Sequence, residues 1–184
     1  DQPWLIECDY DDPHPPSHVP APYDTMYDAS SMRLPPNLSD TLADKPYALG
    51  LSRRRQGTES WSEHDWRKVL AYYCGNITML DDLFGRLLTK LDELGLAQNT
   101  VVIFTSDHGG MLGAHGFLCH GTPAMFDEGL RPPLLVRWPD GVAPGTVCDE
   151  FVSHVDLLPT LAELAGVCAT GSDERPLYGQ SLVP

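Results

Sequence analysis

The sequence predicts an α/β fold built on a mostly parallel sheet flanked by helices, and three observations support this class. The chain has 184 residues, enough for one ordinary domain with its own core. Apolar residues recur at steps of three and four over residues 62–94, as in a long amphipathic helix. The β-branched and apolar run of residues 100–106 (TVVIFTS) follows, as expected of a strand covered on both faces. A helix followed by a buried strand is half of an α/β repeat.

Before the helix, the chain offers little regular pattern. Residues 4–8 (WLIEC) form a short apolar run ahead of a proline-rich turn, and we expect a strand there. From residue 11 to about residue 61 no period is sustained, and several of the 17 prolines fall in this stretch. Because long structureless loops are uncommon inside compact domains, we expect this stretch to wrap over a neighbouring surface or to line a site.

The helix predicted over residues 62–94 has one apolar face, made by Val69, Tyr73, Ile77, Leu80, Phe84, Leu87, Leu91 and Leu94. Gly95 suits the left-handed position that ends a helix. Further strands are expected at residues 134–138 and 147–152.

The last predicted element is a helix near the end of the chain. Asp156 suits its N-cap, Pro159 is tolerated in its first turn, and the helix should continue to Ala165 and end at Gly166.

Composition excludes several classes of function. The formal net charge of -14 disfavours nucleic acid and anionic lipid as partners. No apolar run approaches the roughly 20 residues that cross a bilayer, and we expect neither a membrane span nor a secretion signal. The five cysteines include no Cys-x-x-Cys pair, which disfavours a zinc ribbon, and their odd number favours a reducing compartment over a disulfide scaffold.

The candidate site follows the strand of residues 100–106. One carboxylate and three imidazoles, Asp107, His108, His115 and His120, occur within fourteen residues and are separated by glycines. Ligands of open α/β sheets collect beyond the carboxyl ends of the strands, and a carboxylate beside an imidazole is an ordinary ligand pair for a divalent metal. Alternatively, Asp107 caps a turn and the histidines are structural. A second imidazole cluster lies upstream, at His14 and His18, where the flanking prolines would hold His14 rigidly.

The strings TSDHGGMLGAHG, RPPLLVRWPDG and SHVDLLPTLAELAG occur in this order, with DPHPPSHVPAPYDTMYD upstream and YGQSLVP at the end. Together they resemble the C-terminal half of the catalytic domain of sulfatases, in the alkaline-phosphatase-like superfamily. The resemblance leaves only about residues 40–60 unassigned. Related phosphonate and phosphodiester hydrolases share the SDHG string.

The resemblance implies roles for single residues. Asp107 and His108 match the pair that completes a divalent metal site, with Ca²⁺ placed first and Mn²⁺, Mg²⁺ or Zn²⁺ as alternatives. His14 matches a histidine that contacts the sulfate near the leaving-group oxygen, and His115 matches a pocket-lining histidine. His120 stands where the family usually has a lysine aimed at the sulfate oxygens. Because an unperturbed histidine is only partly charged at neutral pH, we expect activity that is weaker or more dependent on acid pH.

One family feature is absent. Sulfatases carry a formylglycine nucleophile made from the Cys or Ser of a Cys/Ser-x-Pro-x-Arg motif, and this sequence contains no such string. We therefore expect residues 1–184 to be the distal part of one sulfatase-like catalytic domain. The missing N-terminal half, or a partner chain, would supply the formylglycine, and the isolated chain would be inactive.

These inferences favour one function and leave others open. The leading hypothesis is part of a metal-dependent sulfatase that hydrolyses sulfate monoesters. A phosphonate or phosphodiester hydrolase of the same superfamily, a non-catalytic remnant or subunit, and an unrelated metal-binding module are the alternatives. The sequence does not identify the alcohol or sugar that carries the sulfate, nor the compartment.

Overall fold

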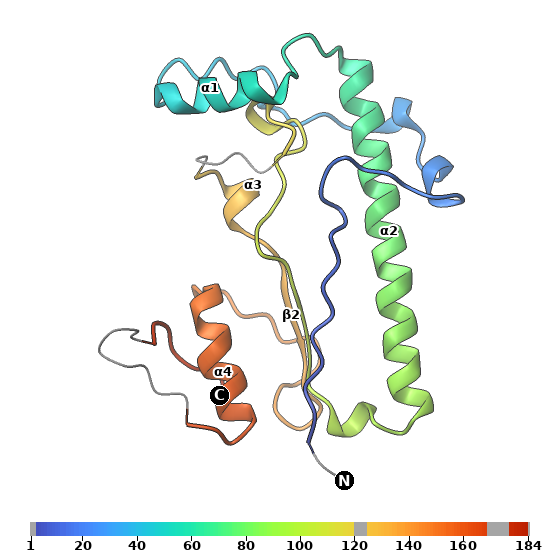
Figure 1. Cartoon of the computed structure of the whole chain (residues 1–184), viewed down its shortest axis with the longest axis vertical. Coiled ribbons are helices and arrows are strands. Elements are labelled where there is room, and N and C mark those ends of the chain that lie inside the picture. Colours follow the sequence, from blue (N-terminus) through green and yellow to red (C-terminus); the bar gives the residue numbers. More distant parts are fainter. Residues whose placement is uncertain (1–2, 120–124, 169–176, 184) are drawn as a thin grey trace. The chain divides into compact units, whose positions relative to one another are not determined.

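The computed structural model describes residues 3–119, 125–168 and 177–183 (Figure 1). The elements in chain order are η1 (Tyr23–Thr25), η2 (Ala29–Ser31), α1 (Tyr47–Gln56), α2 (Glu63–Glu93), η3 (Ala97–Asn99), β1 (Val102–Thr105), η4 (Ala114–Gly116), α3 (Asp127–Leu130), β2 (Leu134–Arg137), η5 (His154–Asp156) and α4 (Leu157–Leu164), where η denotes a 3₁₀ turn. None of the described helices is both long and apolar enough to span a membrane.

The chain divides into two compact units. Unit 1 comprises Asp1–Ala97 and His108–Pro132, and unit 2 comprises Gln98–Asp107 and Pro133–Pro184. The boundary between them thus falls between Asp107 and His108, the two residues predicted to bind a metal.

The long helix of unit 1 confirms its prediction. Ser62 is the N-cap of α2, where its hydroxyl accepts from the backbone N–H of Asp65 and the Asp65 carboxylate accepts from the backbone N–H of Ser62. Gly95 follows the helix at φ +67°, the left-handed conformation expected of a terminating glycine. The helix packs against η1 and η2, so residues 23–31 cover part of its face.

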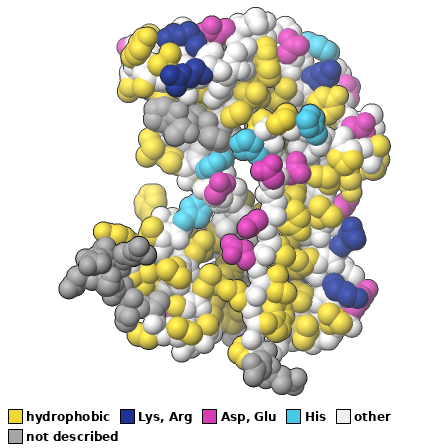
Figure 2. Space-filling model, in the orientation of Figure 1, with side chains coloured by type: hydrophobic (Ala, Val, Ile, Leu, Met, Phe, Trp, Pro, Cys, Tyr) yellow, Lys and Arg dark blue, Asp and Glu magenta, His cyan; other side chains and the backbone are white. Residues whose placement is uncertain are grey.

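Unit 1 also contains a helix that the sequence pattern did not predict, α1. It lies to one side of the N-terminal end of α2 and runs crosswise to that helix (Figure 1), and it ends at Gly57, which has φ +70°. Lys and Arg side chains gather over it (Figure 2), as its last turn carries three arginines. The core of the unit joins α1 and its preceding loop to the glycine-rich loop, through Leu42, Leu49, Met111, Ala114 and Phe117.

In unit 2, β1 pairs with β2, with Val102 opposite Arg137. The strands predicted at residues 100–106 and 134–138 are confirmed within slightly narrower bounds. The pair is antiparallel and its side chains are half buried or exposed, whereas the sequence led us to expect a parallel neighbour and burial on both faces. An antiparallel strand on an otherwise parallel sheet is common in α/β folds, and two strands alone cannot bury both faces.

Two predicted strands are wrong. Residues 4–8 and 147–152 belong to no strand in the described part of the chain. Both segments expose apolar side chains, with Leu5 79% exposed and Phe151 fully exposed. A strand requires a neighbouring strand to pair with, and an apolar run alone does not supply one.

The last helix forms as predicted over Leu157–Leu164, and Gly166 follows at φ +67°. Asp156 is its N-cap by position, but its side chain makes no cap bond to α4. Instead the Asp156 carboxylate accepts from the backbone N–H groups of Ser153, at 2.8 Å, and Gln180, at 2.9 Å. It therefore fastens the end of the chain to η5.

Candidate functional site

The strand end that the sequence singled out lies in unit 2. The hydroxyl of Thr105, the last residue of β1, donates to the Pro133 carbonyl at 2.9 Å. Ser106 follows, and its carbonyl accepts from Nε2 of His154 at 2.8 Å. Asp107 comes next and is exposed. Sequence reasoning assigned no role to His154, although it braces the backbone just before Asp107.

His108, in unit 1, is exposed, and its Nδ1 lies 3.0 Å from the carbonyl oxygen of Gly109. Because a carbonyl only accepts, Nδ1 carries the hydrogen, and in the neutral ring the lone pair is on Nε2. Such a bond orients histidines that ligate metals through Nε2.

The backbone after His108 is closely packed. The N–H of Gly109 donates to the Gly129 carbonyl at 2.9 Å. A Cβ on Gly109 would lie 1.9 Å from the carbonyl oxygen of Glu128, so no other residue fits here without movement. The helix α3 is thereby held directly against the residue that follows His108.

His14 is exposed in a proline-rich turn of unit 1. Its backbone N–H donates to the Asp11 carbonyl at 3.0 Å, and its Nδ1 lies 2.6 Å from the Pro15 carbonyl. The ring is thus fixed as the His108 ring is, with Nδ1 as donor.

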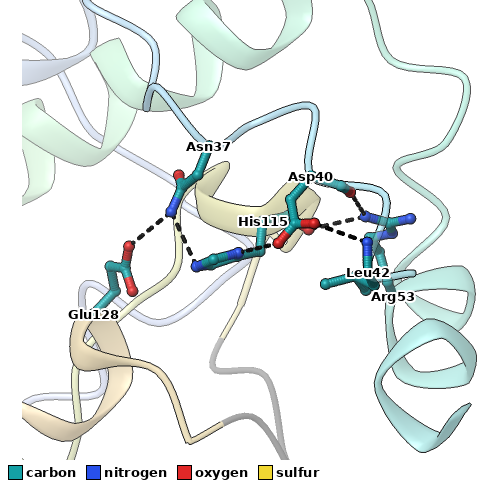
Figure 3. A network of polar contacts seen from close by, with 6 residues as sticks. All are labelled: Asn37, Asp40, Leu42, Arg53, His115 and Glu128. Carbon is teal, nitrogen blue, oxygen red and sulfur yellow. Dashed lines mark hydrogen bonds and ion pairs between the residues drawn. The ribbon is translucent and has the colours of Figure 1, made fainter. Parts of the chain in front are cut away.

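His115 differs, because both of its ring nitrogens have protein partners (Figure 3). Nδ1 lies 2.6 Å from Oδ2 of Asp40, and Nε2 lies 3.0 Å from the amide nitrogen of Asn37. The ring also stacks on Phe126, with centroids 3.9 Å apart. The backbone of His115 is left-handed, at φ +53°, a conformation that non-glycine residues keep only when surrounding contacts hold it.

The partners of His115 are themselves held (Figure 3). Asn37 also donates to the Glu128 carboxylate at 3.2 Å, and Asp40 accepts from the backbone N–H of Leu42 at 2.8 Å. The hydrogen bond from His115, followed by that from Leu42, lowers the pKa of Asp40 below its ordinary value of 3.8. Asn37 and Asp40 were missed by sequence reasoning, since neither belongs to a recognisable motif.

His120, the fifth predicted site residue, lies outside the described residues. The residues that the structure describes bring no three His, Cys, Asp or Glu side chains together as a metal site. Asp107 and His108 fit a metal by donor type and by the tautomer of His108. They supply two of the four or more ligands that such ions take.

Comparison with known proteins identifies the family. A family model described as Sulfatase matches residues 1–167. The chain belongs to the sulfatase family. This sulfatase chain is 34% identical to the "Multifunctional alkaline phosphatase superfamily protein PehA" of Trinickia caryophylli, over 100% of the chain and 37% of that protein. It is 36% identical to the steryl-sulfatase of Mus musculus, over 76% of the chain and 24% of that protein.

Among solved structures, the phosphonate monoester hydrolase SpPMH from Silicibacter pomeroyi matches with a TM-score of 0.81 and 30% identity, over 92% of the chain and 34% of that structure. The resemblance noted in the sequence is confirmed, and the fold is the alkaline-phosphatase-like α/β fold. The chain spans about a quarter to somewhat more than a third of the length of these relatives.

Proposed function

We propose that the protein to which these residues belong is a metal-dependent sulfatase that hydrolyses sulfate monoesters. The observation that carries the proposal is the exposed Asp107 and His108 pair after β1, in a chain that matches the sulfatase family over residues 1–167. An enzyme of this kind needs a cationic, solvent-accessible place for an anionic ester.

In this proposal Asp107 and His108 bind a divalent metal ion. The Nδ1 bond to the Gly109 carbonyl supports the role of His108, because it directs the lone pair to Nε2. When bound, the metal would supply positive charge that stabilises the ester oxygens. We place Ca²⁺ first and keep Mn²⁺, Mg²⁺ and Zn²⁺ as alternatives, since carboxylate ligands suit hard ions and imidazole shifts the preference toward Mn²⁺ or Zn²⁺.

The histidines have different proposed roles. His14 would contact a sulfate or leaving-group oxygen through Nε2, while its Nδ1 bond to the Pro15 carbonyl holds the ring in place. His120 would take the place of the usual lysine against the sulfate. His115 would line the pocket, with its ring nitrogens already occupied by Asp40 and Asn37.

We further propose that residues 1–184 are the distal part of one catalytic domain and that the formylglycine is supplied by a region outside them. Support comes from the absence of a Cys/Ser-x-Pro-x-Arg string in this sequence and from the partial coverage of the relatives. The isolated chain would then be inactive. Mass spectrometry of the full-length gene product should find formylglycine, and an unmodified active protein would contradict this part.

The main test uses the full-length gene product, an aryl sulfate and calorimetric titration with each of the four metals. Asp107→Ala and His108→Ala should lose hydrolysis by at least about a hundredfold and bind the metal more weakly. Asp92→Ala, an exposed carboxylate on α2, is the matched control and should behave as wild type. Equal metal affinity in wild type and Asp107→Ala would remove the metal assignment.

A second function, phosphonate monoester hydrolysis, is supported by the similarity to the Silicibacter pomeroyi hydrolase. The two functions are separated by the ratio of kcat/KM for an aryl sulfate to that for an aryl phosphonate monoester. A ratio above one favours the sulfatase proposal, and a ratio well below one favours the phosphonate alternative. Loss of both activities in the full-length protein would favour a non-catalytic subunit.

A further inference from the structure

Three side chains hold the backbone of residues 115–119: Arg53 and Gln56 in the last turn of α1, and Thr58 just after it. They come from the segment of about residues 40–60, to which the sequence motifs assigned no role although it lies within the residues 1–167 that the family model matches. Residues 115–119 complete the glycine-rich loop, and His120 follows them directly in the sequence.

The contacts bind two carbonyl groups first and then two N–H groups along this backbone. Nη1 of Arg53 donates to the His115 carbonyl at 3.1 Å, and the buried hydroxyl of Thr58 donates to the Gly116 carbonyl at 3.0 Å. Oε1 of Gln56 accepts from two consecutive backbone N–H groups, those of Leu118 at 2.7 Å and Cys119 at 3.3 Å.

Gln56 differs from Arg53 and Thr58 because its one side-chain oxygen accepts from two consecutive backbone N–H groups. It is the last residue of α1, and the left-handed Gly57 turns the chain so that Thr58 reaches the same loop. Between the two contacted stretches, Phe117 is completely buried and anchors the loop in the core of unit 1. The loop is therefore fixed at its middle by packing and at its end by the Gln56 carbonyl oxygen.

We propose that Gln56 is a positioning residue, which sets the backbone of Leu118 and Cys119 at the end of the glycine-rich loop. The proposal rests on the proposed function, because it assumes that the glycine-rich loop, which carries His115, lines the pocket for an anionic ester. Displacements of about an ångström in a catalytic constellation cost large factors in rate, and loops are less well held than helices. A helix-terminal side chain that binds two adjacent N–H groups supplies the missing rigidity.

The contacts predict which substitutions preserve the role. Gln56→Glu keeps an acceptor oxygen at the same reach, and both contacts need only an acceptor. Gln56→Met keeps a similar length and volume but removes the acceptor, leaving two half-buried N–H groups without it. Arg55→Met, at the neighbouring exposed position, changes a side chain of similar length without touching the loop and is the control.

The experiment measures backbone hydrogen exchange at residues 118–119 and steady-state kinetics on an aryl sulfate in the full-length gene product. Gln56→Met should speed exchange there by about tenfold or more and lower kcat by about tenfold with little change in KM. Gln56→Glu should restore both, and Arg55→Met should change neither. If Gln56→Met does not fold, Gln56→Asn, whose amide is one methylene short, carries the same test.

Unchanged exchange in Gln56→Met would overturn the proposal, as would a loss of kcat that Gln56→Glu does not restore. If the wild type hydrolyses neither a sulfate nor a phosphonate ester, the proposed function fails. The positioning of residues 118–119 is then judged by the exchange rates alone. Faster exchange in Gln56→Met that returns to the wild-type rate in Gln56→Glu supports the positioning role. Equal rates in wild type and Gln56→Met overturn it.

Discussion

Nδ1 of His115 lies 2.6 Å from Oδ2 of Asp40, which joins residues 75 positions apart in the sequence. Because a carboxylate only accepts, the ring hydrogen is on Nδ1, and Nε2 accepts from the amide of Asn37. Donors and acceptors are thereby assigned along the whole row: His115 donates to Asp40, and Asn37 donates to both His115 and Glu128.

Asp40→Asn should destabilise the protein by on the order of 1 kcal/mol at neutral pH, a value reduced by the partial exposure of the pair. The single carbonyl oxygen of an asparagine can accept from either the Leu42 N–H or Nδ1 of His115. Its NH₂ group then faces whichever of these two donors is left. Urea unfolding of wild type, Asp40→Asn and the exposed control Asp44→Asn measures the effect. Equal stability of Asp40→Asn and Asp44→Asn would show that the contact contributes nothing.

The same pair predicts a dependence on pH. The pKa of Asp40 is lowered in the folded protein, chiefly by the hydrogen bond from His115. A lowered carboxyl pKa contributes stability that is present above the ordinary value of 3.8 and is lost as the pH falls through the folded value below it. The difference in the free energy of unfolding between wild type and Asp40→Asn should therefore shrink as the pH falls from 3.8 through the lowered pKa of Asp40. A difference that grows toward acid pH would contradict the assignment.

Gly109→Ala should be far more damaging than Gly110→Ala. The first Cβ would lie 1.9 Å from the backbone oxygen of Glu128, whereas the second has no neighbour nearer than 3.8 Å. Backbone cannot rotate away as a side chain can, so we expect a loss of about 3 kcal/mol or more for Gly109→Ala and less than about 1 kcal/mol for Gly110→Ala. Thermal unfolding of the two variants provides the measurement, and similar midpoints would mean that α3 is not held against Gly109.

Two glycines of α2 should respond with opposite signs. A Cβ at Gly75 would lie 2.4 Å from the backbone oxygen of Tyr23, so Gly75→Ala must push η1 away from the helix. A Cβ at Gly85 meets nothing within 4 Å, and Gly85→Ala should stabilise the protein by about 1 kcal/mol through helix propensity alone. Unfolding in urea compares them, and stabilisation by both would place η1 away from α2.

The sequence predicted elements whose signals are local. The helix α2 has a continuous apolar period, a capping pair at Ser62 and Asp65, and a terminating Gly95, so its bounds were nearly correct. By contrast, α1 buries one residue, Leu49, and it owes its place to Met111 and Phe117 far along the chain. Such a helix leaves no period to read, because distant contacts rather than its own pattern hold it.

The candidate site divides in the same way. Asp107, His108 and His14 could be singled out as candidates because each stands in a short motif beside a strand or prolines, and their roles stay predictions. Asn37 and Gln56 could not be singled out, because their contacts are with Glu128 and Leu118, which the linear sequence does not indicate as partners. Polar side chains that hold a loop become visible only when the fold brings their partners together.

Asp156→Ala should release the end of unit 2. The Asp156 side chain is 7% exposed, and its two oxygens accept from the backbone N–H groups of Ser153 and Gln180. Alanine leaves both groups unpaired, so we expect a loss of about 2–3 kcal/mol. Hydrogen exchange should quicken at Gln180 and at Leu182, whose N–H donates to the Thr160 hydroxyl. Asp156→Asn keeps one acceptor, so its stability should fall between those of wild type and Asp156→Ala. The control Asp149→Ala, on the exposed loop, should match wild type. Unchanged exchange at Gln180 in Asp156→Ala would mean that the carboxylate does not hold this segment.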